Sequence, residues 1–201
     1  MTTETFTRSI AALLKDNLPD LTELSALLKN KLLDIKLVVL DVDGVLTDGG
    51  IILADEDSDT KQFNAQDGFG VTLARQAGIR FGILTGRISD AVQRRVEELK
   101  IDYYECGHFY KQDALQSIIG AADLAPEQVL YMGDDVLDLV CKPHVSVFVA
   151  PANAAARVQQ EADWVTSRKG GDAAVREMIE TLLDAQGLLK ITEDFFIGAR
   201  Q

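Results

Sequence analysis

Two aspartates separated by a single residue follow a short apolar segment at residues 37–40. Because side chains alternate along an extended chain, Asp41 and Asp43 project to the same side. Carboxylates this close repel each other unless a cation joins them. An acidic turn ended by Gly44 is the simplest explanation, but buried strands seldom end in such a pair. The pattern therefore favours a site that carries out chemistry.

A hydroxyl and a guanidinium follow a second apolar segment, at residues 81–84. Thr85 and the neighbouring backbone N–H groups can bind a phosphoryl oxygen, and Arg87 is suited to binding a planar anion. Farther along, Lys111 stands where a helix is expected to begin. Each signal is weak by itself, because Thr-Gly is also a common turn and a lone lysine is usually a solvated surface charge.

A second acidic cluster follows the apolar segment at residues 129–132. Asp134 and Asp135 come directly after Gly133, and Asp138 lies one helical turn later. Carboxylate oxygens are the hard ligands that Mg²⁺ prefers in proteins. The same aspartates could cap the N-terminus of a helix, and the two interpretations are compatible.

These residues require a scaffold that brings distant parts of the chain together. Short apolar segments alternate with stretches of helical periodicity. The expected strands are residues 37–40, 81–84, 129–132 and 145–149, and the expected helices are residues 71–77, 89–99, 112–121, 154–161 and 172–185. Strands that are apolar on both faces are typical of parallel sheets covered on both sides, so we predict a doubly wound α/β fold with a mostly parallel sheet. In such a sheet, ligands bind at the carboxyl ends of the strands.

Three further segments lie outside this alternation. Residues 51–53 and 60–63 flank an acidic stretch and predict a small β-hairpin inserted after the first strand. Residues 1–33 carry two helical patterns separated by Pro19 and predict an N-terminal helical extension. We expect the core domain over residues 34–189 and a loosely structured tail at residues 190–201, with Phe195, Phe196 and Ile197 as its apolar residues.

The composition disfavours several classes of protein. The 201 residues include 20 Lys and Arg against 32 Asp and Glu, and the net charge of −12 opposes binding to nucleic acid or to an anionic membrane. Cys106 and Cys141 fit neither a disulfide framework nor a zinc site. We find no signal peptide and no apolar stretch long enough to span a membrane, so we expect the cytoplasm.

The order Asp-x-Asp, Thr, Lys, Gly-Asp-Asp resembles the haloacid dehalogenase superfamily of phosphatases. The resemblance implies a Rossmann-like fold, Asp41 as the nucleophile that forms an aspartyl-phosphate, and Asp43 as the general acid/base. It also implies Mg²⁺ held by Asp41, the main-chain carbonyl of Asp43 and Asp134, with Lys111 and Thr85 on the phosphoryl group. Two-component receiver domains share these residue types in a different arrangement, so a phospho-acceptor module is an alternative.

Longer motifs over residues 34–189 narrow this resemblance. DVDGVLTDG, KQFNAQDGFG, LTGR, GDD, and GGDAAVRE followed by LLDAQG are similar to the capless 3-deoxy-D-manno-octulosonate 8-phosphate phosphatases. The family implies a Mg²⁺-dependent homotetramer without a cap domain, in which each hairpin and C-terminal tail help to close a neighbour's active site. The implied substrate contacts are Asn64, Asp67, Gly68, Arg87, Arg95 and Lys111.

Three positions depart from the family's pattern. Gln66, Thr72 and Asp172 stand where the family has arginine. An octulosonate 8-phosphate carries a carboxylate as well as a phosphate, and each lost charge-assisted contact could forfeit about 1.5–3 kcal/mol. We therefore predict a sugar-acid phosphatase, most simply for 3-deoxy-D-manno-octulosonate 8-phosphate. The alternatives are a nonulosonate 9-phosphate or another small phosphosugar as the substrate, a phosphomutase, or a non-catalytic scaffold.

Overall fold

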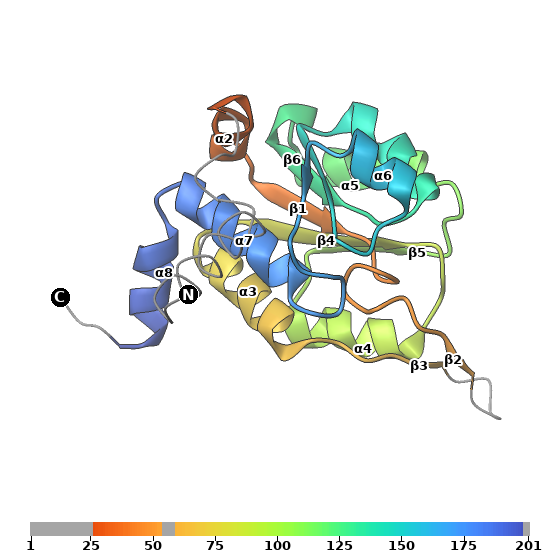
Figure 1. Ribbon diagram of the computed structural model, residues 1–201. Coiled ribbons are helices and arrows are strands. Elements are labelled where there is room, and N and C mark those ends of the chain that lie inside the picture. Colours follow the sequence, from red (N-terminus) through yellow and green to blue (C-terminus); the bar gives the residue numbers. More distant parts are fainter. Residues whose placement is uncertain (1–25, 54–58, 199–201) are drawn as a thin grey trace, which may run out of the picture.

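The computed structural model describes residues 26–53 and 59–198. Within these residues, six parallel strands form one sheet in the order β5-β4-β1-β6-β7-β8. The strands are β1 (Leu37–Leu40), β4 (Arg80–Thr85), β5 (Tyr103–Cys106), β6 (Val129–Met132), β7 (Val147–Ala150) and β8 (Trp164–Val165). The sheet lies between two layers of helices (Figure 1), so the prediction of a doubly wound α/β fold is confirmed.

Both faces of the sheet are buried beneath helices. One core contains residues of α2 (Ala26–Leu33), α3 (Ala65–Gln76), α4 (Asp90–Leu99) and α7 (Ala174–Ala185). The other contains residues of α5 (Gln112–Ala122), α6 (Ala156–Glu161) and the 3₁₀ segment η3 (Val136–His144), which follows the shorter η2 (Pro126–Gln128). Along β1, Val38 and Leu40 pack into the first core, whereas Leu37 and Val39 pack into the second. This double burial explains why the strand is apolar throughout.

The predicted helix at residues 71–77 begins earlier than expected, at Ala65. Asn64 is the N-cap of α3, since its side chain accepts a hydrogen bond from the backbone N–H of Gln66 at 2.8 Å. The first turns contain glycines, which are poor helix formers and conceal the start of the helix. A Cβ at position 68 would lie 2.3 Å from the Nη2 atom of Arg95, so a side chain there would displace the Arg95 guanidinium.

The sequence pattern locates the central strands and misses the two edges of the sheet. β5 and β8 are the outermost strands, and their residues are only partly buried. Edge strands therefore lack the continuous apolar run on which the prediction depends. Ser89 is the N-cap of α4, since its side chain accepts from the backbone N–H of Val92 at 3.3 Å.

The hairpin after the first strand is confirmed. β2 (Ile52–Leu53) and β3 (Asp59–Thr60) pair in antiparallel fashion, with Ile52 opposite Thr60. The two strands project away from the sheet (Figure 1). Between β1 and α3, the described residues form this hairpin and its connecting loops and include no cap domain.

The predicted loose tail is wrong for residues 190–196, which belong to α8 (Leu189–Phe196). The ring of Phe196 contacts that of Phe69 on α3 edge to face, with centroids 5.3 Å apart. Leu189 packs against the core and Thr192 is buried. Leu189, Thr192 and Phe196 lie three and four positions apart, so they share one face of α8. Polar residues between them hide this helical pattern in the sequence.

The N-terminal extension is described only in part. A helix is confirmed at α2, where Leu28 and Leu32 are buried. The first predicted helical pattern lies outside the described residues. No helix in residues 26–53 or 59–198 combines the length and the apolar character needed to cross a membrane.

Candidate active site

Lys111 lies between two buried aspartates at the carboxyl edge of the sheet. Asp41 directly follows β1, and its backbone N–H continues the strand ladder by donating to the carbonyl of Met132. The Lys111 Nζ atom lies 2.9 Å from Asp41 Oδ1 and 2.6 Å from Asp138 Oδ1. None of the three charged residues is more than 7% exposed. An ammonium buried this deeply depends on such pairing, because desolvation alone would strongly oppose its charge.

Burial and pairing act in opposite directions on the pKa values of these groups. Burial would lower the pKa of Lys111, but Asp41 and Asp138 outweigh it and raise that pKa above its ordinary value. For Asp41, burial outweighs the attraction of Lys111 and raises the pKa to about 6. Near neutral pH, Lys111 therefore carries its proton and the Asp41 carboxyl is mostly ionised.

Asp138 is held by four hydrogen bonds. Its Oδ1 atom accepts from Lys111 Nζ and, at 2.7 Å, from the Tyr131 hydroxyl. Its Oδ2 atom accepts from the backbone N–H groups of Asp134 and Asp135, each at 3.0 Å. The capping interpretation of this acidic cluster is confirmed, because Asp135 is the N-cap of η3 and the Asp138 side chain accepts from the Asp135 backbone N–H. Asp138 also anchors Lys111. The sequence analysis had singled out its oxygen chemistry but not this anchoring role.

Three carboxylates converge beside the Lys111 ammonium. Oxygen atoms of Asp41, Asp134 and Asp138 all lie within 4.8 Å of one another. Burial, followed by the charges of Asp41 and Asp138, raises the pKa of Asp134 to about 7. The cluster therefore holds more negative charge than one ammonium balances. An all-oxygen donor set suits Mg²⁺, and this group shares Asp41 and Asp134 with the predicted magnesium site. It adds Asp138, whereas the third predicted ligand, the main-chain carbonyl of Asp43, is not one of these carboxylates.

The backbone around the acidic cluster is tightly packed. Gly44 has φ of +83°, and a Cβ there would lie 1.9 Å from Asp134 Oδ2. Asn153 fixes this loop, because its Nδ2 atom donates to the Gly44 carbonyl at 3.0 Å and its Oδ1 atom accepts from the Gly170 N–H at 2.6 Å. A Cβ on Gly170 would collide with the Gly44 carbonyl. The sequence analysis missed Asn153, because a single loop asparagine belongs to no motif.

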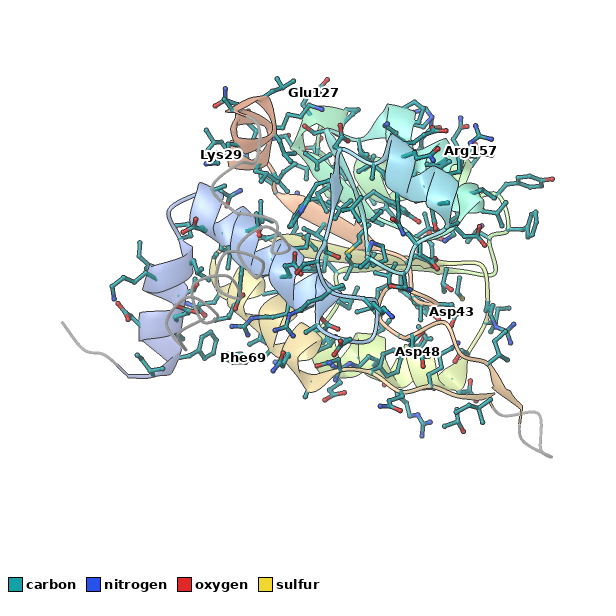
Figure 2. All side chains as sticks on the ribbon, in the orientation of Figure 1. Lys29, Asp43, Asp48, Phe69, Glu127 and Arg157 are labelled. Carbon is teal, nitrogen blue, oxygen red and sulfur yellow. The ribbon has the colours of Figure 1, made fainter. Side chains whose placement is uncertain are left out.

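An open cavity of about 360 Å³ lies over these residues. Thr85, at the end of β4, is buried below it, and its hydroxyl accepts the backbone N–H of Arg87 at 3.4 Å. The Arg87 Nε atom lies 3.9 Å from Asp43 Oδ2. Figure 2 shows Asp43 and Asp48 in the region that follows β1. The cavity lining brings together eight residues that the sequence singled out: Asp41, Asp43, Thr85, Arg87, Lys111, Asp134, Asp135 and Asp138.

Two predicted substrate contacts, Asn64 and Asp67, hold the segment before α7. The Asn64 Nδ2 atom donates to the Gly171 carbonyl at 3.3 Å. Asp67 Oδ1 accepts from the backbone N–H of Arg176 at 2.8 Å, and the Asp67 side chain is 1% exposed. Neither residue lines the cavity in its own chain. Within that chain they position α7, because they satisfy backbone groups near its N-terminus.

Gly68 and Arg95 also lie away from the cavity lining. The Arg95 Nη2 atom donates to the Asn64 carbonyl at 3.3 Å, and its guanidinium lies over the Phe63 ring at 5.5 Å. Gly68 provides the space for that guanidinium. In their own chain these two residues join α3 to α4 and do not reach the site of Asp41.

The three departures from the family's arginine pattern are exposed. Gln66 and Thr72 lie on α3, and Asp172 precedes α7. The Thr72 hydroxyl donates to the Gly68 carbonyl at 3.1 Å, within its own helix. None of the three lines the described cavity, so these substitutions leave its own-chain lining unchanged.

The chain is similar to several characterised proteins, although no protein-family model matches it. It is 39% identical over 156 residues to the 3-deoxy-D-manno-octulosonate 8-phosphate phosphatase KdsC of Escherichia coli (strain K12), which covers 78% of this chain and 83% of that protein. The crystal structure of the 3-deoxy-D-manno-octulosonate 8-phosphate phosphatase from Moraxella catarrhalis, in complex with magnesium ion, phosphate ion and KDO, matches with a TM-score of 0.81 at 35% identity over 84% of this chain and 97% of that chain. A haloacid dehalogenase superfamily (subfamily III A) hydrolase from Legionella pneumophila matches with a TM-score of 0.83 at 35% identity, covering 87% and 96% of the two chains.

Asp67 leads to a testable pH dependence of stability. Burial raises its pKa from 3.8 to about 6, although backbone hydrogen bonds such as that from Arg176 lower it. A raised carboxyl pKa means that ionisation of the carboxyl opposes folding. The protonated Asp67 side chain therefore contributes to the free energy of unfolding at low pH, and this contribution should be lost as pH rises from about 4 to about 6. Asp67→Asn should remove that loss. At about 1.4 kcal/mol per pKa unit, the variant should gain roughly 2 kcal/mol relative to the wild type between pH 4 and pH 8.

Urea unfolding of both proteins across this pH range measures the effect. Parallel profiles of the free energy of unfolding would show that Asp67 titrates as an ordinary exposed carboxyl.

Proposed function

Because the chain belongs to the 3-deoxy-D-manno-octulosonate 8-phosphate phosphatases of the haloacid dehalogenase superfamily, we propose that it hydrolyses a sugar-acid phosphate, most simply 3-deoxy-D-manno-octulosonate 8-phosphate. The observation that carries this proposal is the buried Asp41 carboxylate, which borders the cavity between Lys111 and the acidic cluster. A carboxylate in this position can attack a phosphorus atom held in the cavity. A non-catalytic scaffold would have no use for so costly an arrangement of buried charges.

In the first step, Asp41 attacks phosphorus and the bond from phosphorus to the sugar oxygen breaks. Lys111 and the Thr85 hydroxyl bind phosphoryl oxygens and stabilise the negative charge that spreads over them. Asp43, which also borders the cavity, gives a proton to the departing sugar oxygen. The sugar acid leaves, and the phosphoryl group stays on Asp41 as an aspartyl-phosphate.

In the second step, Asp43 takes a proton from a water molecule as that water attacks the phosphorus. The bond from phosphorus to the Asp41 oxygen breaks, which releases inorganic phosphate and restores the carboxylate. A Mg²⁺ ion held by Asp41, Asp134 and the main-chain carbonyl of Asp43 would offset the repulsion between the carboxylate and the phosphate. Arg87 stands beside Asp43 at the cavity and is placed to contact the sugar acid.

Hydrolysis of a panel of phosphosugars tests the substrate. The panel contains 3-deoxy-D-manno-octulosonate 8-phosphate, a nonulosonate 9-phosphate and glucose 6-phosphate, each assayed with Mg²⁺. We expect the highest kcat/KM for the octulosonate. A higher value for the nonulosonate would reassign the substrate within the sugar acids, and a preference for glucose 6-phosphate would contradict recognition of a carboxylate.

We expect Asp41→Asn to lower kcat by about 10⁴-fold or more, because the amide keeps the volume of the side chain but loses the nucleophile. Asp43→Asn should lower turnover by about 10²–10⁴-fold, because both proton transfers lose their donor or acceptor. Phosphate release measures both losses, and circular dichroism checks the fold. Full turnover by the purified Asp41 variant would rule out the aspartyl-phosphate route.

Removal of divalent metal should abolish activity. The acidic cluster has too much negative charge for Lys111 alone, so phosphate binding beside Asp41 and Asp134 requires a further cation. After EDTA treatment and dialysis, we expect residual activity of about 1% or less, with recovery on addition of Mg²⁺. Ca²⁺ should restore much less, because its coordination is larger and looser. Unchanged activity in the dialysed protein would contradict a metal-dependent reaction.

We also propose that the enzyme acts in the cytoplasm on a small molecule. Cys106 and Cys141 are both free thiols, as expected in a reducing compartment. The net charge of −12 opposes binding to nucleic acid or to anionic lipid. A buried lysine with a nearby acidic cluster suits a compact phosphate ester that can enter the cavity.

A homotetramer is proposed as the working assembly. The β2–β3 hairpin has two residues in each strand, and such an isolated hairpin is marginal in water without a packing partner. Ile51 and Ile52 are each 55% exposed on it. Ile88 and Phe109, which lie near the open cavity, are also exposed. A neighbouring subunit would cover these apolar side chains and exclude water from a site that has no cap.

Sedimentation velocity tests this assembly through the hairpin. We expect a tetramer for the wild type and smaller species for Ile52→Ser, with kcat/KM reduced about tenfold because the site stays open. Leu33→Ser is the matched control. Leu33 is equally exposed but precedes β1, at the amino ends of the parallel strands, whereas the cavity lies at their carboxyl ends. A monomeric wild type at micromolar concentration, or an Ile52→Ser tetramer with normal kinetics, would contradict the proposal.

A further inference from the structure

Lys61 is buried at the base of the hairpin. It directly follows β3, in which Thr60 is exposed, yet the Lys61 side chain is only 3% exposed. Its Nζ atom lies 2.5 Å from Asp43 Oδ1, and the residues are 18 positions apart in the chain. Burial removes water from an ammonium, and this cost in free energy must be offset by an ion pair with a carboxylate. The contact with Asp43 therefore helps to stabilise the buried Lys61 ammonium.

The Asp43 carboxylate is held unequally on its two sides. Oδ1 contacts Lys61, whereas Oδ2 lies 3.9 Å from the Nε atom of Arg87. The Asp43 side chain is 24% exposed and borders the cavity. Lys61 is not among the residues that line the cavity, whereas Asp43 and Arg87 are. The ion pair with Lys61 therefore holds Oδ1, and Oδ2 lies on the side of Arg87, a lining residue.

We propose that Lys61 is a positioning residue for the general acid/base, and that the hairpin thereby supplies part of the acid/base machinery. The inference rests on the function proposed above, in which Asp43 transfers the protons. Lys61 restricts rotation of the Asp43 side chain and aims its free oxygen at the leaving oxygen and then at the attacking water. Asp41, Lys111 and Asp134 lie outside this contact, so nucleophilic attack does not depend on Lys61 directly.

Two substrates separate this role from a general loss of structure. A sugar alkoxide must receive a proton as it leaves, whereas p-nitrophenolate leaves without one. For both substrates, kcat/KM reports steps up to formation of the aspartyl-phosphate. A residue that acts through Asp43 therefore affects kcat/KM for the sugar phosphate and spares that for p-nitrophenyl phosphate.

Lys61→Met in the full-length protein is the principal test. We expect kcat/KM for 3-deoxy-D-manno-octulosonate 8-phosphate to fall by about 10–100-fold, within the range that general acid catalysis contributes. With p-nitrophenyl phosphate, kcat/KM should stay within about twofold of the wild type. Because hydrolysis of the phosphoenzyme also needs Asp43, this substrate should give a burst of about one p-nitrophenolate per site, followed by slow turnover. Lys61→Arg should recover part of the lost activity.

Lys36→Met is the control, because Lys36 is exposed and precedes the amino end of β1, whereas Asp43 follows the carboxyl end of the same strand. It should leave both substrates unaffected. Equal losses of kcat/KM on both substrates in Lys61→Met and Lys61→Gln would overturn the proposal and indicate a structural role. An unchanged or higher kcat/KM for the sugar phosphate would overturn it as well.

A double-mutant cycle supplies a second, independent measurement. Single-turnover formation of the phosphoenzyme from the sugar phosphate is compared for Asp43→Asn with and without Lys61→Met. If Lys61 acts through Asp43, the second substitution should cause no further loss, and additive losses would contradict the proposal.

The wild-type protein distinguishes failure of this inference from failure of the proposed function. If the wild type hydrolyses p-nitrophenyl phosphate but not the octulosonate, the substrate assignment is wrong, and the Lys61 comparison is made with the phosphosugar that the panel identifies.

Discussion

The burial of one ammonium group, that of Lys111, determines the arrangement of the site. A buried ammonium requires carboxylates in contact, and Asp41 and Asp138 provide them at 2.9 Å and 2.6 Å. Asp138 in turn needs the Tyr131 hydroxyl and two backbone N–H groups to hold it in place. With Asp134 included, the negative charge exceeds what Lys111 balances, which creates the demand for a divalent cation. The positions of Asp41, Lys111 and the acidic cluster therefore follow from one charge balance.

The same crowding makes the backbone part of the site. Gly44 must lack a side chain to admit Asp134, and Gly170 must lack one to reach the Gly44 carbonyl. Asn153 joins these two glycines by hydrogen bonds on both sides of its amide. Asp67 binds the start of α7, which follows Gly170 by a few residues. Substitutions in the α3 and α7 region can therefore disturb the loop that follows Asp41, although these helices contribute nothing to the described cavity lining.

A structural element or site residue can be predicted from the sequence only where neighbouring residues in the chain carry the pattern that identifies it. β1, β4 and β6 are buried on both faces, so their apolar runs end abruptly at Asp41, Thr85 and Gly133, and a strand signal coincides with a chemical one. Edge strands and the one-sided helix α8 lack such a run. The roles of Asn153 and Lys61 depend on contacts 109 and 18 residues away along the chain. No periodicity or motif encodes such contacts, because they arise from tertiary packing alone.

The location of the cations explains how an acidic chain can bind a phosphate. At physiological ionic strength, charge is screened over about 8 Å, so most of the net charge of −12 acts weakly on a substrate inside the cavity. Lys111 at the cavity and Lys61 behind Asp43 are almost fully buried, and screening affects their interactions least. Arg87 is partly exposed at the same site. The acidic exterior opposes extended polyanions, whereas a small phosphate that enters the cavity meets Lys111, Arg87 and the divalent cation that the acidic cluster requires. Selectivity for small phosphate esters thus depends on where the cations lie, at the cavity and not on the exterior.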